Sequence, residues 1–299
     1  MLKERIYGRE SGLELLRILA MLGIITMHMF APLMNVATGR NLYVGVFINT
    51  IFNVGVSCFM LVTGYYGIRA KGERFVSLWL TVFFYSVVSY AVIPLVLGEG
   101  FSVASLTKSF LPLAANRYWY MTSFFIIALF SGYIDRMVDG LGREGTRKLL
   151  LLLLVVFSAI PTFLYFQVLS DSGKGPVNMF IIYLIGRYLA RWVDVDKISV
   201  KKTLAALVLL FGSEYVLNIS ASIFRGIYTG KGGVFAPFAR DCSVFTVAAG
   251  VLVFVLFKRM KWKSIGVNLL AFPMFGTYLC EGGGKKGTVP FCTAVLFEK

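Results

Sequence analysis

Charged residues are scarce in this sequence, and histidine occurs once, as His28. Only 15% of the 299 residues are charged, whereas 58% are hydrophobic. The mean hydropathy of +0.76 and several apolar runs longer than the ~18 residues that cross a hydrocarbon core exclude an ordinary soluble protein. We therefore predict an all-α fold, a polytopic membrane helix bundle, because helices satisfy their own backbone hydrogen bonds in lipid.

Cysteines are also few, and their spacing excludes the usual metal sites. The sequence has no CxxC pair among its four cysteines, which are Cys58, Cys242, Cys280 and Cys292. Three of them lie in or beside apolar runs, where a free thiol behaves as a small hydrophobic group. We expect neither a metal site nor a permanently bound cofactor.

The net charge of +15 has a simple explanation in a membrane protein. Lysines and arginines concentrate in alternate segments between the apolar runs, and the positive-inside rule places those segments and the N-terminus in the cytoplasm. We therefore expect membrane lipid around the chain and no nucleic-acid partner. Residues 1–10 are charged and the following run lacks a small-residue cleavage site, so the first span is expected to remain as an uncleaved insertion signal.

Nine apolar runs predict about nine transmembrane helices. Their expected spans are 12–34, 43–68, 75–98, 116–134, 148–169, 176–193, 202–224, 238–257 and 265–281. The loops are too short for an inserted soluble domain, so residues 1–281 are expected to form one membrane domain. The tail, 282–299, contains the linker-like stretch GGGKKG and an apolar run too short to cross a bilayer.

The first span carries a stripe of polar residues. His28 follows Arg17 by eleven positions, which at ~100° per residue is three turns plus ~20°. Both side chains should therefore leave the same helix face, about 16 Å apart along the axis. Glu14, one turn before Arg17, can pair with it and fix its direction.

Each residue of this stripe has a functional and a structural interpretation. An unperturbed imidazole titrates near neutrality, so a histidine such as His28 suits a general base that removes a proton from a hydroxyl. Alternatively, it is a polar packing residue bonded to a neighbouring helix. Arg17 can serve a site, or it can simply extend to the lipid headgroups.

Five segments resemble the acyltransferase-3 family of integral membrane acyltransferases, of the kind that O-acetylate glycans. They are GLELLRILAMLGIITMH with the Arg17-x10-His28 pattern, NVGVSCFMLVTGYYGIR (53–69), NRYWYMTSFFIIALF (116–130), MFIIYLIGRYLAR (179–191) and AFPMFGTYL (271–279). The resemblance covers nearly the whole chain up to Leu279. There the family usually continues into a further span, to about ten helices, whereas this sequence continues CEGGGKKG and has an atypical tail.

The resemblance implies transfer of an acyl group, commonly acetyl from acetyl-CoA as co-substrate, to a hydroxyl of a cell-surface glycan or its lipid-linked precursor. It implies a multi-pass protein of the plasma or inner membrane, with the family's catalytic arginine and histidine at Arg17 and His28. Arg17, Arg69, Lys71 and Arg74 are expected at the cytoplasmic face, where they could bind the phosphates of CoA. The last three could instead only anchor the second span. The pantetheine arm would then follow a corridor toward His28, which deprotonates an acceptor entering from the far side.

Trp119, Tyr120 and Arg117 are the candidates for acceptor binding. We expect them near the outer end of the fourth helix, where the rings can stack on a sugar and Arg117 can bind an anionic glycan. The alternatives are an interfacial aromatic belt and a headgroup contact.

Two polar pairs lie one helical turn apart inside other spans. Asn49 and Asn53 are expected to form hydrogen bonds between helices. Glu214 and Asn218 face the same way on the seventh span, and the resemblance assigns them no role. A proton-coupled transporter or exporter of glycan or small anions, with His28 and Glu214 as proton relays, is the alternative function. The absence of a convincing internal repeat favours the acyltransferase.

Overall fold

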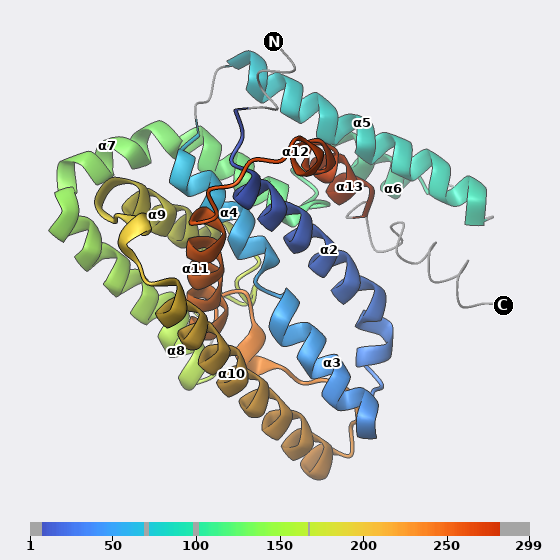
Figure 1. Cartoon of the computed structure of the whole chain (residues 1–299). Helices are drawn as coiled ribbons and strands as arrows, with labels where there is room; N and C mark the ends of the chain where they lie inside the picture. The colour runs from blue at the N-terminus through green and yellow to red at the C-terminus, as the bar shows by residue number, and fades with distance from the viewer. Residues whose placement is uncertain (1–7, 69–71, 98–101, 167, 282–299) are drawn as a thin grey trace.

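The structure, a computed structural model, describes residues 8–68, 72–97, 102–166 and 168–281 (Figure 1). Over these residues the regular structure is helical, without β-strands, which confirms the all-α prediction. The tail, 282–299, lies outside the described residues, as do Arg69 and Lys71.

The first part of the chain forms a hairpin of long apolar helices. α2 (Ser11–Met34) matches the expected first span, and α3 (Gly39–Phe52) and α4 (Gly55–Tyr66) follow it. The expected second span, 43–68, corresponds to one apolar segment, Gly39–Tyr66, which an interruption at Asn53 and Val54 divides into α3 and α4. At this break the Asn53 amide donates a hydrogen bond to the Ala239 carbonyl of a distant segment.

The middle of the chain is more helical than expected. α5 (Gly72–Leu97) and α6 (Val103–Phe110) precede α7 (Trp119–Leu154), a π-helical turn, η1 (Val155–Ala159), and α8 (Ile160–Phe163). The two helices expected over 116–134 and 148–169 are both present, but they extend toward each other and meet at a kink within α7, in place of the expected loop (Figure 1). Only Gly142 leaves the helical conformation there, at φ 61°, which glycine adopts without a steric penalty.

The last part contains α9 (Pro176–Trp192), η2 (Val195–Lys197), α10 (Val200–Thr229), η3 (Pro237–Ala239), α11 (Val244–Lys258), α12 (Ile265–Ala271) and α13 (Met274–Glu281). α11 begins later than the expected residue 238, because Ser243 caps it by accepting a hydrogen bond from the Phe245 amide. The helix expected over 265–281 is interrupted at Phe272 and Pro273, where proline lacks the amide hydrogen that a continuous helix needs.

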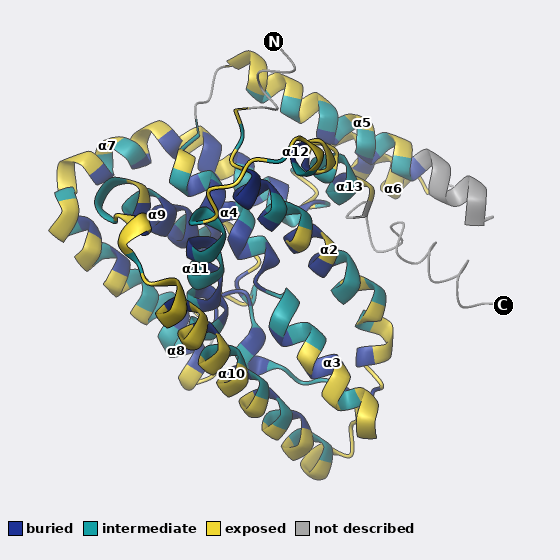
Figure 2. Ribbon diagram, in the orientation of Figure 1, coloured by how far each residue is buried: buried dark blue, intermediate teal, exposed yellow. Residues whose placement is uncertain are grey.

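The centre of the bundle is the packing of α4 against α9, with α11 beside them (Figure 2). Gly64 and Gly186 let the two backbones approach, and a Cβ at Gly64 would lie 2.3 Å from the Tyr183 carbonyl oxygen. Next to Gly186, the Arg187 guanidinium links α9 to α7, since its Nε donates a hydrogen bond to the Asp135 carboxylate at 2.7 Å.

The outer surfaces of the bundle are apolar. Ile227 is 75% exposed and Leu209 71% exposed, both on α10. Four helical segments in the described residues are long and apolar enough to cross a membrane: Ser11–Met34, Gly39–Tyr66, Trp119–Phe163 and Val200–Thr229. The chain is therefore a membrane helix bundle, with lipid as the natural solvent of its exterior.

Candidate functional site

Arg17 and His28 leave the same side of α2 but open into two different cavities. The cavity at Arg17 has a volume of about 320 Å³ and is called here the aromatic cavity. The cavity at His28 has a volume of about 340 Å³ and is called the polar cavity. On α2, Ile24 lines the first cavity and Met27, next to His28, lines the second, so about one helical turn, ~4.5 Å, separates them.

The expected single corridor is thus two cavities placed end to end. They lie on opposite sides of the break between α3 and α4, because Val56 lines the aromatic cavity and Asn53 lines the polar cavity. Gly55 packs at the break, where a Cβ would lie 3.0 Å from the Ala20 carbonyl oxygen of α2. The dividing wall therefore depends on close contact between α2 and the start of α4.

The aromatic cavity is lined by side chains of six helices, α2, α4, α5, α7, α12 and α13. Its rings are close neighbours: the Tyr120 and Tyr278 centroids are 5.9 Å apart, and those of Phe59 and Tyr120 are 6.4 Å apart. Apart from Arg9 and Arg17 it is lined by Ile24, Val56, Phe59, Thr63, Leu78, Tyr120, Met121, Phe124, Ala271, Phe272, Met274, Phe275 and Tyr278. This lining suits a long, mostly apolar ligand segment.

Two guanidinium groups stand at the mouth of the aromatic cavity. Arg9 and Arg17 also line a third space of about 340 Å³, called the rim cavity, with Glu14 and Tyr66. Glu14 is buried and accepts hydrogen bonds from Arg17 at 2.9 Å and from Arg9 at 3.3 Å. One carboxylate thus holds two cations in place, and each guanidinium keeps further N–H donors for an anionic ligand.

The polar cavity brings together four separate segments of the chain. Its polar lining comprises His28, Asn35, Asn49, Asn53, Ser172, Lys174, Arg240 and Asp241. The segment 237–241 is held firmly, because the Ala239 carbonyl accepts from Asn53 and Arg240 Nε donates to the Pro237 carbonyl at 2.9 Å. Amides, charges and an imidazole in one space suit a ligand with many hydroxyl groups.

Asp241 is the acidic residue in this lining, and no motif of the sequence marks it as a site residue. It lies in the segment between α10 and α11, is only 3% exposed, and shares the cavity with His28. Burial raises the pKa of Asp241 to about 6, while the nearby Lys174 and His28 favour its charged form. The sequence signal was the charged pair Arg240–Asp241 at the start of an apolar run.

The other candidate residues are not gathered around His28. Tyr120 lies in the aromatic cavity with Arg17, and the Trp119 ring packs against it at 6.2 Å. Arg117 is partly buried, and Arg74 is exposed at the start of α5; neither lines the three cavities. The expected roles of Trp119, Tyr120 and Arg117 in acceptor binding stay predictions, as does that of Arg74 in donor binding.

Glu214 and Asn218 are buried but do not line these cavities. The Asn218 side-chain oxygen accepts from the Phe238 amide at 3.0 Å, which helps to fix the segment that carries Asp241. The Glu214 carboxyl oxygens have no hydrogen-bond partner among the described residues. Asn218 therefore has a structural role next to the polar cavity.

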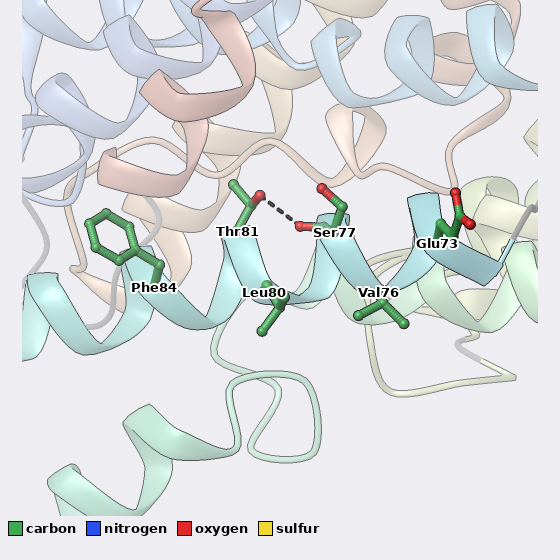
Figure 3. Close-up of a pocket in the computed structure, with 6 residues that line it drawn as sticks. All are labelled: Glu73, Val76, Ser77, Leu80, Thr81 and Phe84. Atoms are coloured by element: carbon green, nitrogen blue, oxygen red, sulfur yellow. Dashed lines mark hydrogen bonds between the residues drawn. The ribbon is translucent and has the colours of Figure 1, made fainter.

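A larger groove of about 720 Å³ runs along one face of α5 (Figure 3). All six lining residues belong to this helix, and the Thr81 hydroxyl is already bonded to the Ser77 carbonyl at 2.8 Å. Such an open face of a single helix suits lipid, so we do not assign a site to it.

Comparison with known proteins gives one match. A protein family whose sequence model is described as an acyltransferase domain matches residues 10–280. No curated protein and no solved structure matches the chain.

Proposed function

The chain belongs to the acyltransferase-3 family, and from this premise we propose that it transfers an acyl group from acyl-CoA to a hydroxyl of a cell-surface glycan or lipid-linked glycan precursor. It is a membrane acyltransferase. Acetyl is the acyl group we propose, and the plasma or inner membrane is the proposed location, crossed several times.

We assign acyl-CoA to these two cavities because Arg9 and Arg17 line both the rim cavity and the aromatic cavity. Acyl-CoA has the matching order of parts, a polyanionic head followed by a long, thin arm. We infer that the phosphates bind the two guanidinium groups, which match phosphate geometry. The pantetheine arm then lies among the rings of the aromatic cavity.

The acceptor is assigned to the polar cavity because its lining offers many hydrogen bonds. Asn35 and Asn49 can each donate to and accept from sugar hydroxyls, and Lys174 can donate. His28 opens into the same space and is the proposed general base. In the reaction the hydroxyl oxygen forms a bond to the thioester carbon, its proton moves to His28, and the C–S bond breaks. The proton then passes to the departing thiolate.

Direct transfer requires the reacting atoms to approach to ~3–3.5 Å. The wall at Ile24 and His28 is about one helical turn thick, so we infer that its side chains part when donor and acceptor are both bound. In this arrangement the acyl group crosses the wall, while neither the CoA nor the glycan does.

His28→Ala tests the function. In purified full-length protein with radiolabelled acetyl-CoA and surface glycan, we expect kcat to fall about 100-fold or more, because general-base catalysis typically contributes 10²–10⁴. Leu33→Ala is the matched control, since Leu33 is an exposed residue of the same helix outside the polar cavity. A His28→Ala protein that inserts normally and acetylates at the wild-type rate would overturn the assignment.

Proton-coupled transport remains the alternative from the sequence. It would use Glu214 together with His28, but Glu214 does not line the cavity that contains His28. The match to an acyltransferase family also favours acyl transfer over transport.

A further inference from the structure

We propose that Asp241 positions the His28 imidazole in the polar cavity and stabilises its protonated form. This inference deepens the proposed function and rests on it, because His28 is there the base. Asp241 acts through His28, not on the substrate, and is therefore a positioning residue.

The first argument is the placement of the two residues. His28 is on α2 and Asp241 follows η3, yet both line the same cavity of about 340 Å³. Asp241 is only 3% exposed, so its carboxylate is withdrawn from bulk water. Burying a carboxylate is costly unless it has a charged or hydrogen-bonding partner, and the His28 imidazole, which lines the same cavity and acts electrostatically on Asp241, can serve as one.

The second argument is the rigidity of the Asp241 backbone. Its carbonyl accepts a hydrogen bond from the Asn178 amide of α9 at 3.0 Å. The preceding Arg240 is fixed by the Pro237 and Pro161 carbonyls, and the Ser243 amide donates to the Arg240 carbonyl at 2.8 Å. A carboxylate on so constrained a segment can hold a ring in one orientation, as a positioning residue must.

The third argument is the balance of charge around the pair. Lys174, from the segment before α9, and Arg240 are the cationic residues of the lining, and Asp171 acts on Asp241 from nearby. α3 contributes the uncharged Asn49, and the uncharged Asn53 follows at its end. Two cations in this space disfavour a third, the imidazolium that forms when His28 takes the proton of the acceptor. Asp241 supplies the negative charge that offsets them.

These features assign a chemical role. A carboxylate that accepts a hydrogen bond from one ring nitrogen leaves the other free to take the proton of a hydroxyl. It also stabilises the resulting imidazolium without itself becoming protonated. The acceptor proton thus resides on His28 until the thiolate leaves, and Asp241 lowers the energy of that state.

The single histidine makes a direct test possible. In full-length protein labelled with isotopic histidine, the one imidazole signal is followed by NMR as a function of pH, without substrate. We expect Asp241→Asn, which keeps the shape and removes the charge, to move the titration midpoint to lower pH by about 1 unit or more. Asp196→Asn, at an exposed carboxylate that pairs with Lys261, is the control and should leave the midpoint in place. A folded Asp241→Asn protein with an unchanged midpoint would overturn the proposal.

Kinetics give the second readout. We expect Asp241→Asn to lower kcat about 100-fold with little change in the KM for acetyl-CoA, and Asp241→Glu to recover part of the loss. A shifted imidazole titration with wild-type kcat would also refute the positioning role. Activity in His28→Ala would instead refute the proposed function, and the NMR titration would still decide whether the two residues interact.

Discussion

At the scale of single residues, the centre of the proposed donor site is the carboxylate of Glu14. It is buried and forms ion pairs with the guanidinium groups of both Arg9 and Arg17. These ion pairs fix the direction of two side chains that would otherwise be mobile at a membrane surface. The pattern Glu14–Arg17 on one helix face predicted this pair from the sequence alone. Arg9 could not be predicted, because it lies just before α2 and only the fold brings it to Glu14.

Arg17 should therefore act on donor binding more than on the chemical step. We expect Arg17→Ala to raise the KM for acetyl-CoA about 10–100-fold, since a hydrogen bond to a charged group contributes roughly 1.5–3 kcal/mol. The measurement is initial rate against acetyl-CoA concentration in detergent. Arg147→Ala, at an exposed arginine paired with Glu144, is the control. An unchanged KM in Arg17→Ala would remove Arg17 from the phosphate site.

At the scale of elements, the sequence predicted where most helices lie but not where they break. Apolar runs flanked by charges mark the helices, yet the break at Asn53 and the turn at Gly142 lie inside continuous patterns. The charged stretch after residue 134 is typical of a loop, but it is helical, and two of its acids, Asp135 and Asp139, pair with arginines of α9. Asp139 binds Arg191 at 2.9 Å, and such contacts between distant helices leave no local signal.

The packing of α4 on α9 leads to a prediction at this scale. Gly64→Ala should destabilise the protein by about 1–3 kcal/mol, because the new Cβ would lie 2.3 Å from the Tyr183 carbonyl oxygen and force the helices apart. Gly212→Ala is the matched control in open space on α10, where alanine should be neutral or stabilise by about 0.5–1 kcal/mol. Thermal unfolding in detergent measures both. Equal unfolding temperatures for the two variants would contradict this account.

At the scale of the whole molecule, the order of the three cavities follows the direction of the proposed reaction. The rim cavity and the aromatic cavity lie toward the N-terminal end of α2, and the polar cavity lies toward its C-terminal end. The positive-inside count predicts which end faces the cytoplasm, although it could not predict the cavities, since they form only where distant segments meet.

This orientation can be measured by labelling. In a protein with all four cysteines replaced, we expect Lys231→Cys to react with a membrane-impermeant maleimide in intact cells, because the segment between α10 and α11 is predicted outside. Lys261→Cys, between α11 and α12, should react only after permeabilisation. Both positions are exposed in the structure, so a difference in their labelling reports the side of the membrane and not burial in the protein. The reverse pattern would invert the donor and acceptor sides.

The turn of α2 between Ile24 and His28 has a consequence for the cell that carries the protein. A single open shaft through the bundle would conduct ions and protons and would discharge the membrane potential. Two separate cavities, divided along α2 by this turn, do not form such a shaft. In the proposed reaction, the acyl group would then cross the membrane without a path that conducts ions.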